Sequence, residues 1–168
     1  KFKFKQIKII QGNHDANSQS TILSTFAPLK NVKVITEPTD EEIDGISYLY
    51  LPYYYHEGTD KEPMIKCYSE LYKKYENKTF DFCFGHIEDD SEHFSDKYCD
   101  LSKLKVKQFL HGHIHTENVS KGGRYLGSPV LCSYSESGKT PLIARINSDT
   151  EKCDFIKVPK FLEYYEVS

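Results

Sequence analysis

Three short sequences carry residue types that can bind a metal ion: Gly12-Asn13-His14-Asp15, Gly85-His86 and Gly112-His113-Ile114-His115. In each, a glycine follows an apolar stretch, and imidazole, amide or carboxylate groups come next. Such groups are ligands for divalent metals in proteins. Each motif also has a simpler interpretation: a polar turn for the first, a buried hydrogen-bonded histidine for the second and a solvated histidine pair for the third. The recurrence of one pattern at three places favours a metal site.

The elements that must position these groups are short strands. Apolar runs predict strands over residues 6–10, 80–84 and 106–110, each ending close before one of the three motifs. Because ligands of open α/β sheets bind outside the carboxyl ends of the strands, we expect these strands to be parallel neighbours. On a continuing strand His113 and His115 would share one face. Gly112 permits the backbone to bend there instead.

The remaining pattern predicts a single α/β domain with mixed sheets. Strands separated by helices early in the chain, followed by strands alone, are typical of this class, and 168 residues suffice to bury a core. Helices are expected over residues 17–27 and 60–75, the second with apolar residues at helical spacing. Further strands are expected over residues 32–35, 46–51, 124–126, 142–146, 155–158 and 162–167, with a turn at Asp44-Gly45 before the second of these.

Composition narrows the compartment and the partners. The net charge is −3, with acidic and basic residues interspersed, which neither demands a polyanionic partner nor excludes one whose phosphates are held by metal ions. The sequence has no apolar stretch long enough to span a membrane and no signal-peptide pattern. Its five cysteines, odd in number and without Cys-x-x-Cys spacing, indicate reduced thiols. We therefore expect a cytoplasmic protein that does not engage a membrane.

The three motifs resemble, in order, the third, fourth and fifth motifs of the calcineurin-like metallophosphoesterases. Within that superfamily, Leu51-Pro52-Tyr53 and the segment from Tyr125 to Pro129 are similar to the SbcD-type DNA repair nucleases. The run from Asn31 to Gly45 is similar to the phage branch, whose nuclease subunit works with an SbcC-like ATPase. The resemblance covers most of residues 6–147 and implies a metallophosphoesterase-type mixed β-sheet sandwich flanked by helices.

The resemblance also implies a role for each motif residue. The metal ligands would be Asn13, His86, His113 and His115, holding two divalent ions, with Mn²⁺ preferred and Mg²⁺ as the alternative. Asn13 and His14 would bind the substrate phosphate, and His14 would be the general acid, with Asp15 holding its other ring nitrogen. The implied activity is metal-dependent phosphodiester hydrolysis by a DNA exonuclease or endonuclease subunit in double-strand-break repair or recombination. The implied partners are DNA, an SbcC-like ATPase and a second copy of the complete nuclease, in the host cytoplasm if the protein is phage-encoded.

The sequence also departs from the superfamily pattern. The first two motifs, an Asp-x-His and a Gly-Asp whose aspartates hold the first metal and bridge the pair, do not occur in these residues. Residues 1–168 therefore resemble the second half of a nuclease core, forming one domain. The four implied ligands are neutral, whereas hard divalent ions prefer carboxylates. We expect this chain alone to bind at most one metal well and to have little activity.

Two other functions stay open at this point. A metallophosphoesterase acting on small-molecule or protein phosphate esters would use the same groups. A non-catalytic scaffold with this fold would not need a general acid, so the intact Asn13-His14-Asp15 sequence favours an enzyme. Outside the motifs, His93 is interpreted as a surface residue and His111 as a packing residue, because Gly112 breaks the alignment of His111 with His113. Tyr53 is interpreted as packing at a strand end rather than stacking on bases.

Overall fold

The computed structural model describes residues 4–15, 21–54, 62–87, 100–120, 123–130, 133, 136 and 138–159. Over these ranges the protein is mostly β. The strands are β1 (Ile7–Ile10), β2 (Val32–Ile35), β3 (Thr39–Ile43), β4 (Ile46–Leu51), β5 (Thr79–Gly85), β6 (Lys105–His111), β7 (Asn118–Ser120), β8 (Gly123–Tyr125), β9 (Leu142–Asn147) and β10 (Lys152–Lys157). The helices are α1 (Glu62–Tyr75) and two 3-10 helices, η1 (Ile22–Phe26) and η2 (Leu101–Lys103).

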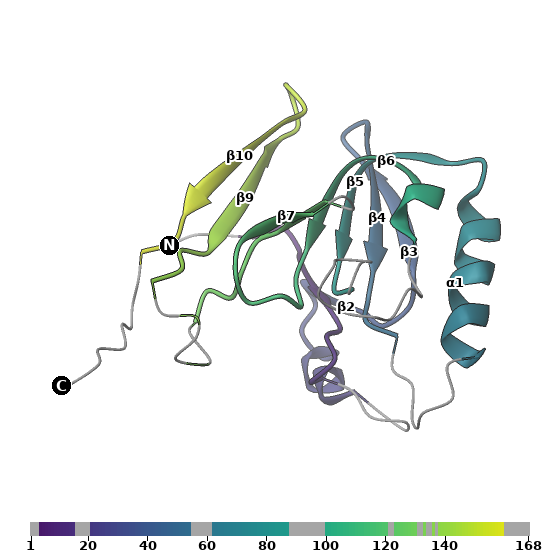
Figure 1. Cartoon of the computed structure of the whole chain (residues 1–168), viewed down its shortest axis with the longest axis horizontal. Coiled ribbons are helices and arrows are strands. Elements are labelled where there is room, and N and C mark those ends of the chain that lie inside the picture. Colours follow the sequence, from purple (N-terminus) through teal and green to yellow (C-terminus); the bar gives the residue numbers. More distant parts are fainter. Residues whose placement is uncertain are drawn as a thin grey trace.

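Six of the strands form one mixed sheet in the order β3-β4-β5-β6-β8-β7. The central strands β4, β5, β6 and β8 run parallel to one another, and β3 and β7 pair antiparallel at the two edges. β1 and β2 form a separate parallel pair, and β9 and β10 form a hairpin. Figure 1 shows α1 along one side of the six-stranded sheet and the β9–β10 hairpin at the opposite end of the molecule.

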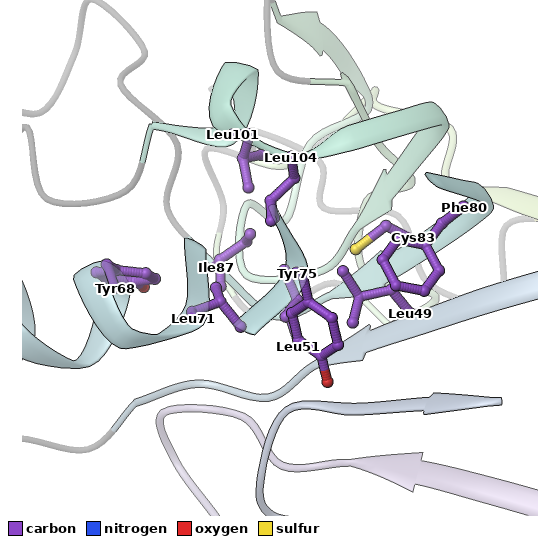
Figure 2. Packing of buried hydrophobic residues seen from close by; sticks show 10 residues of the cluster. All are labelled: Leu49, Leu51, Tyr68, Leu71, Tyr75, Phe80, Cys83, Ile87, Leu101 and Leu104. Atoms are coloured by element: carbon purple, nitrogen blue, oxygen red, sulfur yellow. The ribbon is translucent and has the colours of Figure 1, made fainter. Parts of the chain in front are cut away.

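The main core lies between α1 and the central strands. β4 and β5 read as nearly continuous apolar runs because each is paired on both edges and buried, as is typical of parallel strands. Figure 2 shows the buried cluster of side chains from α1, β4, β5 and the segments next to them. Ile87, which follows His86 directly, is 1% exposed within this cluster. The core therefore anchors the chain just beyond the end of β5.

The α/β expectation is met only in its coarse part. The mixed sheet and the helix α1 are confirmed, but the described helices are fewer than a sandwich flanked by helices requires. The helix predicted over residues 17–27 is, in its described part, the single 3-10 turn η1; residues 16–20 lie outside the description. Thr21 caps this turn by accepting a hydrogen bond from the Leu23 N–H, and Pro28 disfavours continuation.

Strand prediction succeeded where apolar runs are buried and failed at the sheet edges. The predicted strands ending before residues 11, 85 and 111 are β1, β5 and β6, and both residues of the Asp44-Gly45 turn have positive φ, 51° and 80°. β3 was missed because its sequence, Thr-Asp-Glu-Glu-Ile, is acidic, as suits an edge strand. The strand predicted over residues 162–167 lies outside the described residues. No helix in the described part of the chain is long and apolar enough to cross a membrane.

Asp81 on β5 ties together three of the central parallel strands, β4, β5 and β6. Its Oδ2 accepts hydrogen bonds from the backbone N–H and the hydroxyl of Ser47 on β4, at 2.8 and 2.7 Å. Its Oδ1 lies 2.6 Å from the Lys107 ammonium on β6. The hydrogen bond from Lys107, followed by those from Ser47, lowers the pKa of Asp81 to about 2. This carboxylate therefore fixes β4 and β6 against β5 at the end of the sheet away from the motifs.

We expect Asp81→Asn to lower the free energy of unfolding at neutral pH by about 1–3 kcal/mol, because hydrogen bonds to a charged acceptor are lost. The folded-state pKa of Asp81 is depressed, so its contribution is complete above the ordinary value of 3.8 and is lost as the pH falls toward about 2. Denaturant unfolding at several pH values should show the two proteins converging over that range. Asp154→Asn, which removes an exposed ion pair with Arg145, is the matched control and should cost much less. An equal loss in both variants would contradict the cross-strand role.

Candidate metal centre

Backbone hydrogen bonds continue the sheet beyond the ends of its strands and carry it into the motifs. In each bond, the backbone N–H of a residue just after one strand donates to a carbonyl oxygen at or just past the end of a neighbouring strand. The bonds are Tyr53 N–H to Gln11 O (2.8 Å), His86 N–H to Leu51 O (2.9 Å), Gly112 N–H to Gly85 O (2.8 Å) and Leu126 N–H to His111 O (3.1 Å). The three motifs therefore meet at one edge. β1 was expected in the same sheet as β5 and β6; it lies instead in the β1–β2 pair and reaches this edge through Tyr53.

The imidazole of His86 lies between two glycines from different motifs. A Cβ atom at Gly12 would stand 2.9 Å from its Cε1, and a Cβ at Gly112 would stand 3.0 Å from its Nδ1. In this slot Nε2 of His86 lies 2.9 Å from Oδ1 of Asn13. This contact is a hydrogen bond between the two side chains. Adjacent ligands of an octahedral ion with bonds of about 2.1 Å are about 3 Å apart, so the same two atoms are also close enough to bind one ion in place of that hydrogen bond.

His113 is held in a left-handed backbone conformation beside His86. Its φ is +80°, a value that non-glycine residues rarely adopt and that is found at functional sites. Its ring lies 5.3 Å from the ring of His86, nearly perpendicular to it, and stacks at 6.0 Å on Tyr53. β6 ends at His111, so His113 and His115 do not share a strand face; the bend at Gly112 and His113 positions them instead.

His115 is more exposed and is held by a residue that the sequence analysis did not identify. Its Nδ1 lies 2.9 Å from Oε1 of Glu136, which is 6% exposed and also accepts a hydrogen bond from the Ser133 hydroxyl at 3.0 Å. The local sequence signal is only Ser133-x-x-Glu136, a spacing typical of helix capping. Because Glu136 is far from the histidines in sequence, no motif pointed to it.

The general-acid pair is arranged differently from the expectation. Oδ2 of Asp15 accepts a hydrogen bond from the Gly12 N–H at 2.7 Å and so closes the turn that presents Asn13. No hydrogen bond joins Asp15 to His14, both of which the structure describes, and the His14 side chain is exposed at the rim of the cluster. In this structure Asp15 therefore shapes the loop rather than orienting the His14 ring.

Burial and mutual repulsion keep the inner imidazoles neutral. Burial lowers the pKa of His86 to about 4, with a further lowering from His113 and an opposing effect from Asp15. Burial also lowers the pKa of His113, helped by the charges of His115 and His14. These effects place His14 and His115 within electrostatic reach of both inner rings, and Asp15 within reach of His86. A neutral imidazole is the form that binds metals.

The described residues fit part of a metal coordination shell. Among them, no group of three or more His, Cys, Asp or Glu side chains is placed so that it could hold a metal ion. The amide of Asn13 and the ring of His86 fit two adjacent ligand positions, and the ring of His113 lies against that of His86. Oδ2 of Asp15 accepts a hydrogen bond from the Gly12 N–H, and Oε1 of Glu136 is in contact with Nδ1 of His115. Of the residues assigned as ligands, Asn13, His86 and His113 thus lie together, and His115 lies within electrostatic reach of the two inner rings and contacts Glu136.

Two residues outside the predicted ligand set complete the surroundings. His111 is 1% exposed and lies between the rings of Phe109 and Tyr125, with centroids 5.7 and 5.1 Å away. Its contacts are those of a packing residue. Tyr53 packs on both His86 and His113, so its ring forms a wall of the cluster.

Comparison with known proteins adds no relative to these observations. Neither a scan against protein-family models nor a search of curated proteins returns a match for this chain. The assignment of function therefore depends on the motifs and on the geometry of the cluster.

We expect the His86 ring to titrate with a midpoint near pH 4 in the metal-free protein, because burial opposes protonation. The NMR signal of its Cε1 proton reports this titration. The folded-state pKa lies below the ordinary value of 6.5, so the unfolded chain takes up a proton that the folded chain excludes. Stability should consequently fall as the pH drops from 6.5 toward 4. Histidine NMR titration combined with thermal unfolding measures both effects. A His86 midpoint near 6.5 would contradict the burial of its ring.

We expect Gly12→Ala to displace the His86 ring and to weaken Mn²⁺ binding, because the new methyl group would stand 2.9 Å from its Cε1. Isothermal titration with Mn²⁺ and the NMR signals of His86 report the two effects. The control is Gly85→Ala, whose methyl group would press on Ile87 and His111 rather than on the His86 ring. If both variants bound Mn²⁺ as the unaltered protein does, the slot between the glycines would have no part in metal binding.

Proposed function

We propose that this protein is a metal-dependent phosphoesterase that hydrolyses phosphodiester bonds, acting as a DNA nuclease subunit. The observation that carries the proposal is the meeting of Asn13, His86 and His113 at one sheet edge, with Nε2 of His86 2.9 Å from Oδ1 of Asn13. These are the residues that the resemblance to calcineurin-like metallophosphoesterases assigns to metal binding. A half-buried neutral imidazole next to an amide oxygen offers two donor atoms of the kinds that bind divalent ions.

The residues of the cluster divide into two groups by exposure. Asn13, His86 and His113 are half-buried and, together with the more exposed His115, would hold the ions, of which Mn²⁺ is preferred. When bound, a pair of divalent ions supplies an activated water and neutralises charge on the phosphoryl oxygens. Asn13 also has an amide NH₂ that is suited to a phosphate oxygen. Its half-buried position would let one residue serve both the ion and the substrate.

His14 is the residue suited to protonating the leaving oxygen. It is exposed at the rim, next to Asn13, and its charge acts on the pKa of both His86 and His113. A group so placed reaches a phosphate held at Asn13 without being a metal ligand. In this role His14 donates a proton to the departing alkoxide and is reprotonated from solvent.

DNA is the proposed substrate because the segments that distinguish nucleases within the resemblance lie at the same edge. Leu51-Pro52-Tyr53 leads from β4 to the wall of the cluster, and Tyr125 begins the segment whose Leu126 and Ser128 amides bond to His111 and His115. A polynucleotide bound at this edge of the sheet would therefore contact both residues 51–53 and the segment that begins at Tyr125. The chain's net negative charge leaves the bound cations as the principal attraction for phosphate.

Where the two metal motifs absent from these residues are also supplied, we expect His14→Ala to lower Mn²⁺-dependent cleavage of DNA ends by about 10²–10⁴-fold, the usual contribution of a general acid. Mn²⁺ content should stay near that of the unaltered protein, because His14 is not a ligand in this proposal. Cleavage of labelled duplex and single-stranded DNA, measured alongside metal content, provides the test. Nitrophenyl phosphates assayed in parallel separate a nuclease from a phosphoesterase of small substrates.

His93→Ala is the matched control, because His93 lies in a polar segment outside the described residues and has no role in the proposal. Its cleavage rate should be unchanged. Undiminished cleavage by His14→Ala would remove His14 from the mechanism. Failure of the unaltered protein to bind Mn²⁺ at all would overturn the proposed function itself.

A further inference from the structure

The contact between His115 and Glu136 is a polar contact of the cluster that the motifs do not explain. Oε1 of Glu136 lies 2.9 Å from Nδ1 of His115 and 3.0 Å from the Ser133 hydroxyl. The Glu136 side chain is 8% exposed, whereas that of His115 is 41% exposed. A carboxylate buried to this degree is costly unless it is hydrogen-bonded, so its two partners are part of the reason it is stable there.

The main chain of His115 is fixed independently of its ring. The Ser128 N–H donates to the carbonyl oxygen of His115 at 2.9 Å. Gly127, just before it, has φ +80°, and a Cβ there would stand 3.1 Å from the same oxygen. The segment after β8 therefore holds the backbone of His115 by a hydrogen bond, whereas Glu136, further along the chain, contacts its ring.

We infer that Glu136 is a positioning residue that orients His115 so that Nε2, and not Nδ1, faces the metal site. This inference rests on the proposed function, because it assigns Glu136 to the outer shell of the same site. An imidazole whose Nδ1–H donates to a carboxylate has its lone pair on Nε2, on the other side of the ring. Carboxylate–histidine–metal arrangements of this kind fix the tautomer and make the histidine a stronger ligand.

The geometry distinguishes this role from a salt bridge that only stabilises the fold. A pair that only stabilises the fold needs no ligand groups beside it, but His115 is exposed and sits at the edge of a cluster that also holds His86, His113 and Asn13. Glu136 is instead the buried member, and its Oε1, which contacts His115, also accepts a hydrogen bond from the Ser133 hydroxyl. The buried carboxylate would thus serve as a fixed support for the more exposed ring.

The test compares the full chain with Glu136→Ala and Glu136→Gln. Glu117→Ala is the matched control. Glu117 is a half-buried carboxylate close to His115 in the sequence, but it accepts its hydrogen bond from Arg124 and not from His115. At about pH 8, where ordinary imidazoles are neutral, long-range ¹H–¹⁵N spectra of the metal-free proteins report the tautomer of each histidine. Titration with Mn²⁺ alone then gives the affinity, and thermal unfolding verifies that each variant is folded.

The expected result is the Nδ1–H tautomer for His115 in the unaltered protein, in Glu136→Gln and in Glu117→Ala. In Glu136→Ala the Nε2–H tautomer should appear, and Mn²⁺ affinity should fall by about 10–100-fold. Glu136→Gln, which keeps an acceptor oxygen, should lose less affinity and keeps the test valid if Glu136→Ala unfolds.

Two results would overturn the inference without touching the proposed function. They are an Nε2–H tautomer for His115 in the unaltered protein, and Mn²⁺ affinity that is the same in the unaltered protein and in both Glu136 variants. If the unaltered protein bound no Mn²⁺, the proposed function and the metal role of Glu136 would fall together, even with the expected tautomer.

Discussion

The site depends on main-chain hydrogen bonds that extend the parallel sheet past the ends of its strands. Amides of Tyr53, His86 and Gly112 each bond to a carbonyl at the end of a neighbouring strand. Because these bonds involve backbone atoms, the positions of the motif residues follow from sheet register rather than from their own side chains. They also bring β1, which belongs to a separate pair of strands, to the same edge as β4, β5 and β6.

Close packing then makes the chemistry of the cluster possible. The ring of His86 fits because Gly12 and Gly112 have no side chains, and Ile87 anchors the following residue in the core. Burial in this slot lowers the pKa of His86 and keeps it neutral, which costs stability at acidic pH but leaves a lone pair available. A general acid must instead exchange protons with solvent, and His14 is placed at the rim where this is possible.

The sequence predicted those parts of the fold and site that arise from local pattern. Apolar runs ending in glycine marked β5 and β6, and the histidines that follow them lie together as predicted. Features that depend on tertiary context were missed: β3 is acidic because it is an edge, and η1 is a short 3-10 turn where a longer helix was predicted. Glu136 was missed for a similar reason, since only the folded chain brings it to His115.

The shared backbone bonds have a consequence for how this protein opens locally. The last rungs of the sheet are also the bonds that hold Tyr53, His86 and Gly112 in place. Fraying of the strand ends and disassembly of the cluster are therefore one event, with one opening free energy. A cation held at this edge would resist that opening. It would therefore slow amide hydrogen exchange in β1, β4, β5 and β6, the strands that meet there.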